Sequence, residues 1–392
     1  MTAPSPARPT GPTALTERAL GPDLARGLML LFIALANSHY FLPAPSVLGG
    51  YPQDGSALDS VVIWLLATFV DGRAFPMFGL LFGYGVAQIA RRHEAAGPRS
   101  VRRLLRRRSL VLVAVGLVDA LLCYAGDILA AYGVLLFVTL WAVRWKDRWV
   151  LLTALAFLVL TSLPGGDSNT ISRDGPHPAL LPPDPGTMLA ARAQAALFVA
   201  TLGPLGFMAP FMVGLWAGRR RILERPERHR WLLRAAAAIG VGAAAIGAQP
   251  ISLMLAGVVP PPEQSTLELL GPLHDTTGVL GGFGYAALFA LVATRPRVRR
   301  ASAVGALAAT GQRSMTCYLM QSAVWAVVFT PFLLGLADDL SVAGTALLAT
   351  ATWAVTVLVA DRMHRAGHRG PFETLVRRVT YGRPSAAPAA RP

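Results

Sequence analysis

Several side chains that could do chemistry lie within apolar stretches of the first third of the chain: Asn37, His39, Asp71, Arg73, Asp119 and Asp127. Ionisable groups in such surroundings cost several kcal/mol unless they are paired or hydrated, so each is a candidate functional residue. His39 is the natural general base, and a carboxylate from Asp71 or Asp119 would orient its ring and raise its basicity. The alternatives are an ion pair between packed helices for each charge, and for His39 a ring packed at a membrane interface.

Further along the chain, Arg192, Arg313 and the pair His274–Asp275 also interrupt apolar stretches. Arg313 begins a polar stripe that continues to Tyr318 and Gln321. This stripe could bind anionic groups, or Arg313 could anchor the helix by reaching to the membrane surface. The two cysteines, Cys123 and Cys317, lie in apolar runs, so we expect neither a disulfide nor a metal site.

The composition explains why these polar groups stand out. The chain has 392 residues, of which 54% are hydrophobic and 15% charged, and its mean hydropathy is +0.49. A soluble domain would carry about a quarter charged residues to cover its surface. A lipid-facing surface removes that need, so we expect an all-α integral membrane protein.

Ten apolar segments recur along the chain, and most reach the roughly 20 residues that a crossing helix needs. Two of them, 59–90 and 188–218, are too long for one straight crossing and contain Gly and Pro, so we expect a broken or kinked helix in each. The segments 109–125 and 127–143 are predicted to form a helical hairpin. The ten segments are 25–42, 59–90, 109–125, 127–143, 149–164, 188–218, 232–258, 274–294, 312–335 and 342–361.

The distribution of the basic residues predicts how these ten segments are oriented in the membrane. With the N-terminus in the cytoplasm, the cytoplasmic stretches hold 31 of the 36 basic residues and the opposite loops hold one, Arg173. This bias predicts a multi-pass protein of the cell (plasma) membrane with about ten crossings and both termini cytoplasmic. The formal charge of +15 therefore reflects contact with anionic lipid heads and not a nucleic-acid partner.

We expect residues 1–22 and 383–392 to be disordered tails, and residues 23–382 to form one transmembrane domain with an N-terminal half (23–164) and a C-terminal half (188–382). At about 1.5 Å per residue, Asn37 and His39 lie about 16 and 20 Å deeper than Arg26. Asp71 and Arg73 fall near the middle of the next segment, and Asp119 and Asp127 flank the hairpin turn. If the first four helices bundle, these groups line one polar cavity.

Several motifs resemble the YeiB family, which is catalogued as domain of unknown function 418. The resemblance covers nearly all of residues 24–382, although the family more often has His at the position of Asp119. It rests on Arg26-Gly27 with Asn37, on the run from Asp71 to Gly83, on Gly116–Tyr132, on Gly311–Ser322 and on Gly370–Gly382.

The first two helices are also similar to those of the heparan-glucosaminide acetyltransferase relatives. This likeness implies transfer of an acyl group from a cytoplasmic thioester such as acyl-CoA, a co-substrate and not a bound cofactor, to a small-molecule, glycan or lipid acceptor. His39 with Asp71 or Asp119 would supply the base, and Asn37 would contact the thioester oxygen.

The remaining polar residues would bind the donor or the acceptor, with arginines on the donor phosphates. These residues are Arg26, Arg73, Asp127, Arg313, Tyr318 and Gln321. Two other functions stay open at this point. The broken segments and buried charges also suit a transporter for a small solute, and a non-catalytic membrane component is the third.

Overall fold

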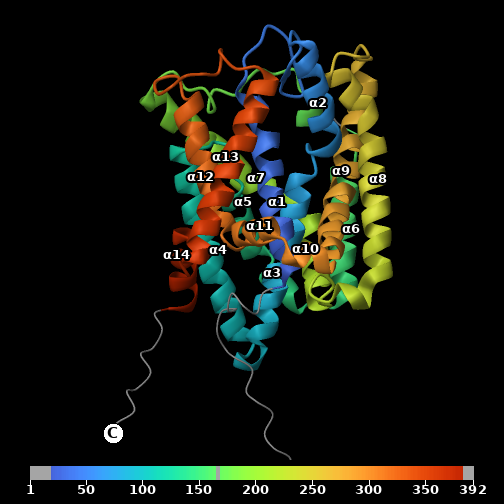
Figure 1. The fold of residues 1–392 in the computed structure, drawn as a ribbon, viewed down its shortest axis with the longest axis vertical. Coiled ribbons are helices and arrows are strands. Elements are labelled where there is room, and N and C mark those ends of the chain that lie inside the picture. Colours follow the sequence, from blue (N-terminus) through green and yellow to red (C-terminus); the bar gives the residue numbers. More distant parts are fainter. Residues whose placement is uncertain (1–18, 165–167, 383–392) are drawn as a thin grey trace, which may run out of the picture.

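The computed structural model describes residues 19–164 and 168–382, and these form one helical bundle (Figure 1). A two-stranded antiparallel hairpin follows the first helix, with strands β1 (Val47–Leu48) and β2 (Tyr51–Pro52). The helices are α1 (Leu20–Ser38), α2 (Ala57–Phe69), α3 (Ala74–Arg92), α4 (Pro98–Leu122), α5 (Leu129–Val138), α6 (Asp147–Thr161), α7 (Pro185–Arg219), α8 (Arg230–Leu255), α9 (Gln264–Val292), α10 (Pro296–Arg300), α11 (Ser302–Gln312), α12 (Ser314–Phe329), α13 (Val342–Arg365) and α14 (Pro371–Tyr381). Short 3-10 turns are η2 (His39–Phe41), η3 (Glu94–Ala96), η4 (Ala142–Arg144), η5 (Asn169–Ile171) and η6 (Pro226–His229).

The two ends of the bundle differ in charge. The lower end in Figure 1 carries the turns 93–97 and 220–229 together with α14, and we call it the basic end because arginines gather there. The opposite end carries the β hairpin and the connections 256–263 and 330–341.

The outer surface of the bundle is apolar, as a lipid-facing surface must be. Six helical stretches are long and apolar enough to cross a membrane, and the helices Leu129–Val138 and Ser314–Phe329 are apolar but shorter, within the part of the chain that the structure describes. Large hydrophobic side chains point outward from several of them, including Leu197, Ile246 and Leu347, which are 66%, 75% and 71% exposed. A soluble protein does not expose such a surface. The chain is therefore a membrane-embedded, all-α protein.

The first break predicted within a long apolar segment is confirmed. Helix α2 ends at Phe69 and α3 begins at Ala74, and Gly72 between them has φ +72°. Glycine reaches this left-handed region without strain. The second prediction is wrong in part: α7 continues through Pro204 and Pro210 from Pro185 to Arg219, so that segment is not broken.

The predicted hairpin of 109–143 is confirmed by α4 and α5, which pack against each other. The Ser109 hydroxyl donates to the Gly133 carbonyl oxygen at 2.7 Å across this pair. Of the expected N-terminal tail, residues 20–22 instead form the first turn of α1, where Gly21 and Pro22 are buried. Residues 1–18 and 383–392 lie outside the described residues, so both tails stay predictions.

The Arg26-Gly27 motif has a packing role. A Cβ atom added to Gly27 would collide with the Leu307 carbonyl oxygen of α11, and one added to Gly311 would collide with the Asp23 carbonyl oxygen of α1. The two glycines therefore let the backbones of α1 and α11 touch. This close contact sets Arg26 and Arg313 on neighbouring elements at the basic end.

Candidate functional site

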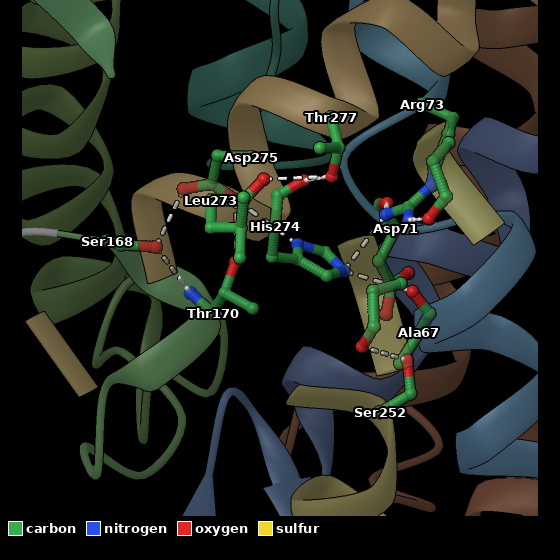
Figure 2. Close-up of polar contacts among 12 residues, drawn as sticks. Ala67, Asp71, Arg73, Ser168, Thr170, Ser252, Leu273, His274, Asp275 and Thr277 are labelled. Atoms are coloured by element: carbon green, nitrogen blue, oxygen red, sulfur yellow. Dashed lines mark hydrogen bonds and ion pairs between the residues drawn. The ribbon is translucent and has the colours of Figure 1, made fainter. Parts of the chain in front are cut away.

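A buried polar network joins the break between α2 and α3 to α9 (Figure 2). The fully buried Arg73 guanidinium donates to the Asp71 backbone carbonyl oxygen and, at 2.9 Å, to that of Ala244. It also lies 2.9 Å from the His274 Nε2 atom. These contacts satisfy a charge that the surrounding helices would otherwise exclude.

His274 connects Arg73 to Asp275, and Figure 2 shows the two on opposite sides of its ring. Its Nδ1 atom lies 3.4 Å from the Asp275 carboxylate, which also accepts hydrogen bonds from Ser168 at 2.7 Å and Thr170 at 2.9 Å. Because Arg73 always carries its protons, His274 accepts at Nε2 and is protonated at Nδ1. The Ala67 carbonyl oxygen, 3.0 Å from Nε2, is then a polar neighbour and not an acceptor.

His39 and Asp71 approach the same aromatic ring, that of Tyr51. The His39 and Tyr51 rings stack with centroids 3.8 Å apart, and the Tyr51 hydroxyl donates to Asp71 Oδ2 at 2.6 Å. Burial, and then the Asp71 charge, raises the pKa of Tyr51 well above its usual value, so this hydroxyl keeps its proton. Tyr51 lies on β2, a strand that the loop sequence did not predict.

His39 itself is almost fully buried, with 1% of its surface exposed. Neither ring nitrogen makes a hydrogen bond of regular geometry, although the Leu35 carbonyl oxygen and the Asp71 charge both act on the ring. One Asp71 oxygen, Oδ1, is likewise buried without a partner. Buried imidazoles and carboxylates are normally satisfied, so this pair is available for another group.

Asp119 and Asp127 form a second group on the α4–α5 hairpin. Asp127 accepts from the Ala130 amide at 3.1 Å and from the Tyr318 hydroxyl. Asp119 contacts the Ser322 hydroxyl and Cys123, and it interacts with the charge of Arg192. Each carboxylate has one buried oxygen with no hydrogen-bond partner.

A cavity of about 270 Å³ opens at the basic end. Glu373 is the acidic side chain on its lining, opposite six arginines contributed by α1, α3, α4, α14 and the residues between helices. The arginines are Arg26, Arg92, Arg108, Arg313, Arg369 and Arg377. We call this space the basic cavity.

The inner wall of the basic cavity is aromatic and leads to the second carboxylate group. Phe78 and Tyr132 pack with their ring centroids 4.6 Å apart, and Tyr318 lines the same wall. The Tyr318 hydroxyl lies 3.4 Å from the Ile128 amide and also contacts Asp127. The cavity is therefore lined by aromatic rings and by arginines that range from the exposed Arg369 to the buried Arg313, and Tyr318 on its wall contacts a buried acid.

Backbone oxygens hold two of the arginines in place. Arg26 donates to Asp23 at 3.2 Å and to the Leu81 carbonyl oxygen at 3.1 Å. Arg313 donates to the Ala309 carbonyl oxygen at 3.1 Å and to that of His368. Both guanidinium groups are therefore fixed in position along the cavity wall before any ligand binds.

The structure divides the residues predicted to share one cavity. His39, Asp71 and Arg73 lie together, and Asp119 and Asp127 lie together, but no hydrogen bond or ion pair within the described residues joins Asp119 to His39. Asn37 is half-buried near the end of α1. Tyr40 lies between the two groups: its ring centroid is 4.3 Å from that of His39, and its hydroxyl interacts electrostatically with Asp71 and with Tyr124 of the hairpin turn.

The residues predicted to bind the donor are divided as well. Arg26, Arg313 and Tyr318 line the basic cavity, whereas Arg73 is held in the network with His274. Gln321 is buried and donates to the Leu30 carbonyl oxygen at 3.3 Å. Among residues 19–164 and 168–382, no group of three or more His, Cys, Asp or Glu side chains is arranged to hold a metal ion.

Sequence comparison adds two findings. The chain is 27% identical over 410 aligned residues to the "Uncharacterized protein YxaH" of Bacillus subtilis (strain 168), an alignment that covers 94% of this chain and 96% of that protein. That relative's description names no activity. The resemblance read from the motifs is confirmed, because residues 217–383, from the end of α7 through α14, match the family described as "Protein of unknown function (DUF418)".

Proposed function

We propose that this protein is a transmembrane acyltransferase that takes an acyl group from a cytoplasmic coenzyme A thioester. The observation that carries this proposal is the basic cavity, in which six arginines and one glutamate surround an opening with an aromatic interior. Guanidinium groups bind phosphates by charge and by paired hydrogen bonds. A coenzyme A thioester combines phosphates at one end with a long neutral arm at the other, which matches this division.

The size of the cavity restricts how the donor would bind. A volume of about 270 Å³ is slightly below the usual range for a small-molecule site. The arm of the thioester would therefore fill the interior, while the phosphates stay at the mouth beside the exposed Arg369. The acyl end would then extend past Tyr318 and Asp127 and along α1 toward His39.

His39 is the base that we assign to the reaction. It begins η2 directly after α1 and lies ten residues beyond Met29 of the cavity wall, a distance of about 15 Å along the helix axis. In the transfer, the acceptor oxygen or nitrogen bonds to the thioester carbonyl carbon and the carbon–sulfur bond breaks. His39 takes the acceptor's proton and returns it to the departing thiolate, so coenzyme A leaves as a thiol. Asp71, through Tyr51, would hold the His39 ring in place.

The topology that fits this reaction is that of a plasma-membrane protein with about ten crossings. The basic end and both termini then lie in the cytoplasm. Positive residues cluster at cytoplasmic ends of membrane helices. This orientation gives the basic cavity access to cytoplasmic coenzyme A thioesters. The acceptor, a small molecule, glycan or lipid, would then reach His39 from the opposite end.

Thioester turnover tests the proposal. Purified protein in detergent is incubated with acetyl-CoA and a panel of hydroxyl and amine acceptors, and thiol release is measured. We expect release that depends on an acceptor and falls at least a hundredfold in His39→Ala, while His364→Ala, which changes an exposed histidine of α13, stays active. Both variants must keep the wild-type melting temperature. The absence of turnover with every acceptor would contradict the proposal.

A solute transporter is the second candidate, favoured by the break between α2 and α3. Two half-helices meet there around Asp71, whose Oδ1 atom is buried without a partner. Interrupted helices with such groups form substrate sites in transporters. Solute accumulation in proteoliposomes that is lost in Asp71→Asn, with no thioester turnover, would support this function instead.

A further inference from the structure

A second hollow opens at the basic end, apart from the basic cavity. It is a groove of about 430 Å³ between α3, the start of α4, η4 and the end of α7. No residue of this groove lines the basic cavity, so the two are separate sites. We call it the lateral groove. Its polar lining residues are Arg91, Glu94, Arg102, Arg144 and Arg219.

The arginines of the lateral groove differ in whether other residues of the protein pair with them. Arg219 is held by Asp147 at 3.0 Å and by the Trp145 and Ala142 carbonyl oxygens. Arg91 pairs with Glu224 at 2.7 Å through its Nη2 atom, but its Nη1 atom is buried without a hydrogen-bond partner. The side chains of Arg102 and Arg144 make no hydrogen bond or ion pair with any residue in the described part of the chain. The groove therefore offers donors that the protein does not satisfy itself.

The positive end of the α4 helix dipole lies at the same place. Gly97 and Pro98, which begin this helix, line the groove, and no side chain caps the helix. The partial positive charge of a helix N-terminus favours an anion. It acts here through the helix dipole alone, because the Gly97 amide donates to the Glu94 carbonyl oxygen at 3.1 Å and Pro98 has no amide hydrogen. Together with the unpaired arginines, this geometry suits a phosphate group.

The apolar residues that line the groove indicate which kind of phosphate compound fits. The floor of the groove is formed by apolar side chains: Ala87, Ala90, Val101, Leu140, Val143 and Leu215. Beside it, Trp141, Trp145 and Trp149 are spaced four residues apart and are 55%, 43% and 52% exposed. Exposed tryptophans mark the level where a membrane protein meets the lipid headgroups. Inorganic phosphate would gain nothing from these apolar surfaces.

We propose that the lateral groove binds the phosphate headgroup of an anionic phospholipid from the surrounding bilayer. The phosphate lies between the start of α4 and the Arg102 and Arg144 guanidinium groups, and the acyl chains lie against the apolar floor and the tryptophans. Basic pockets between helices at a membrane surface are suited to such headgroups. This site depends on the membrane embedding of the chain and not on the acyltransferase proposal.

Lipid titration of the purified full-length protein tests the site. Protein in a zwitterionic detergent is titrated with phosphatidylglycerol or with phosphatidylcholine, and bound lipid is counted by native mass spectrometry. We expect saturable binding of phosphatidylglycerol that weakens with salt, and little binding of phosphatidylcholine. In the double variant Arg102→Gln/Arg144→Gln the affinity should fall about fivefold for each arginine removed.

The matched control is Arg103→Gln/Arg107→Gln, which removes the same charge from exposed positions of α4 outside the groove. An equal loss of affinity in both double variants would overturn the proposal, because it would show a general charge effect. Displacement of the lipid by millimolar inorganic phosphate would also overturn it, in favour of a soluble anion. If the double variant does not fold, Arg144→Gln alone serves, since Arg144 is exposed.

Discussion

Tyr51 donates a hydrogen bond to the Asp71 carboxylate at 2.6 Å while its ring stacks on His39 at 3.8 Å. A short β hairpin at the opposite end of the bundle thus holds the end of α1 against the break between α2 and α3. The three residues come from parts of the chain that the sequence places in different segments. This contact positions the base and the carboxylate of the proposed reaction.

Tyr51→Phe should lower the free energy of unfolding by about 2 kcal/mol, because the buried Asp71 carboxylate loses its hydroxyl donor. Tyr40→Phe is the matched control, since the Tyr40 ring also contacts His39 at 4.3 Å but its hydroxyl makes no hydrogen bond within the described residues. Thermal unfolding in detergent measures both. Equal melting temperatures for the two variants would show that the Tyr51–Asp71 bond contributes nothing.

His274→Leu should cost about 3 kcal/mol of stability, because the fully buried Arg73 would lose one of its acceptors. His274→Gln keeps an oxygen that can accept from Arg73, so it should recover part of this loss. The comparison is made by denaturant or thermal unfolding. If the leucine and glutamine variants are equally stable, the His274 ring does not act as an acceptor.

Glu373→Ala should loosen α14 from the bundle. Glu373 accepts hydrogen bonds from the Met315 amide at 2.8 Å and the Thr316 amide at 3.1 Å at the start of α12. Loss of such a cap costs about 1 kcal/mol. Hydrogen exchange should rise across 371–381 in this variant and stay unchanged in Glu227→Ala, which alters an exposed residue. Unchanged exchange in α14 would contradict this role.

Asp147 should make the stability of the fold at the basic end depend on pH. Partial burial alone would raise the pKa of Asp147, but hydrogen bonds from Arg219 and Arg220 outweigh it and lower the pKa. A carboxylate whose pKa is lowered in the folded protein stabilises the fold when the pH is above its pKa in the unfolded chain, about 4. This stabilisation is lost as the pH falls below that value toward the pKa of the folded protein. Asp147→Asn should therefore be less stable than the wild type at pH 7, and the difference should shrink in acid. An undiminished difference at low pH would exclude this cause.

The local features of the fold followed from the sequence. A glycine beside a charged pair predicted the break at Asp71–Arg73, and a tight turn predicted the α4–α5 hairpin. Proline misled the prediction for α7, because a helix packed among others can continue through Pro204 and Pro210 when neighbouring groups satisfy the freed carbonyl oxygens.

The site was harder to predict because it depends on long-range packing. Depth along each helix placed six polar residues in one layer, but depth says nothing about the direction in which a helix faces. His39 and Asp119 therefore fell into separate groups. Tyr51 carried no signal, since it lies in a loop whose hairpin is set by tertiary contacts. The basic cavity combines arginines such as Arg92 and Arg377, whose positions in the sequence indicate only the orientation of the chain in the membrane.

Binding of a coenzyme A thioester in the basic cavity, as we propose, is measured most directly by the affinity of the purified protein for acetyl-CoA. Arg377 lines the cavity and Arg378, its neighbour on α14, is exposed and does not. Isothermal titration should give saturable binding that weakens at least fivefold in Arg377→Gln and is unchanged in Arg378→Gln. No saturable binding, or an equal effect of the two substitutions, would contradict the claim.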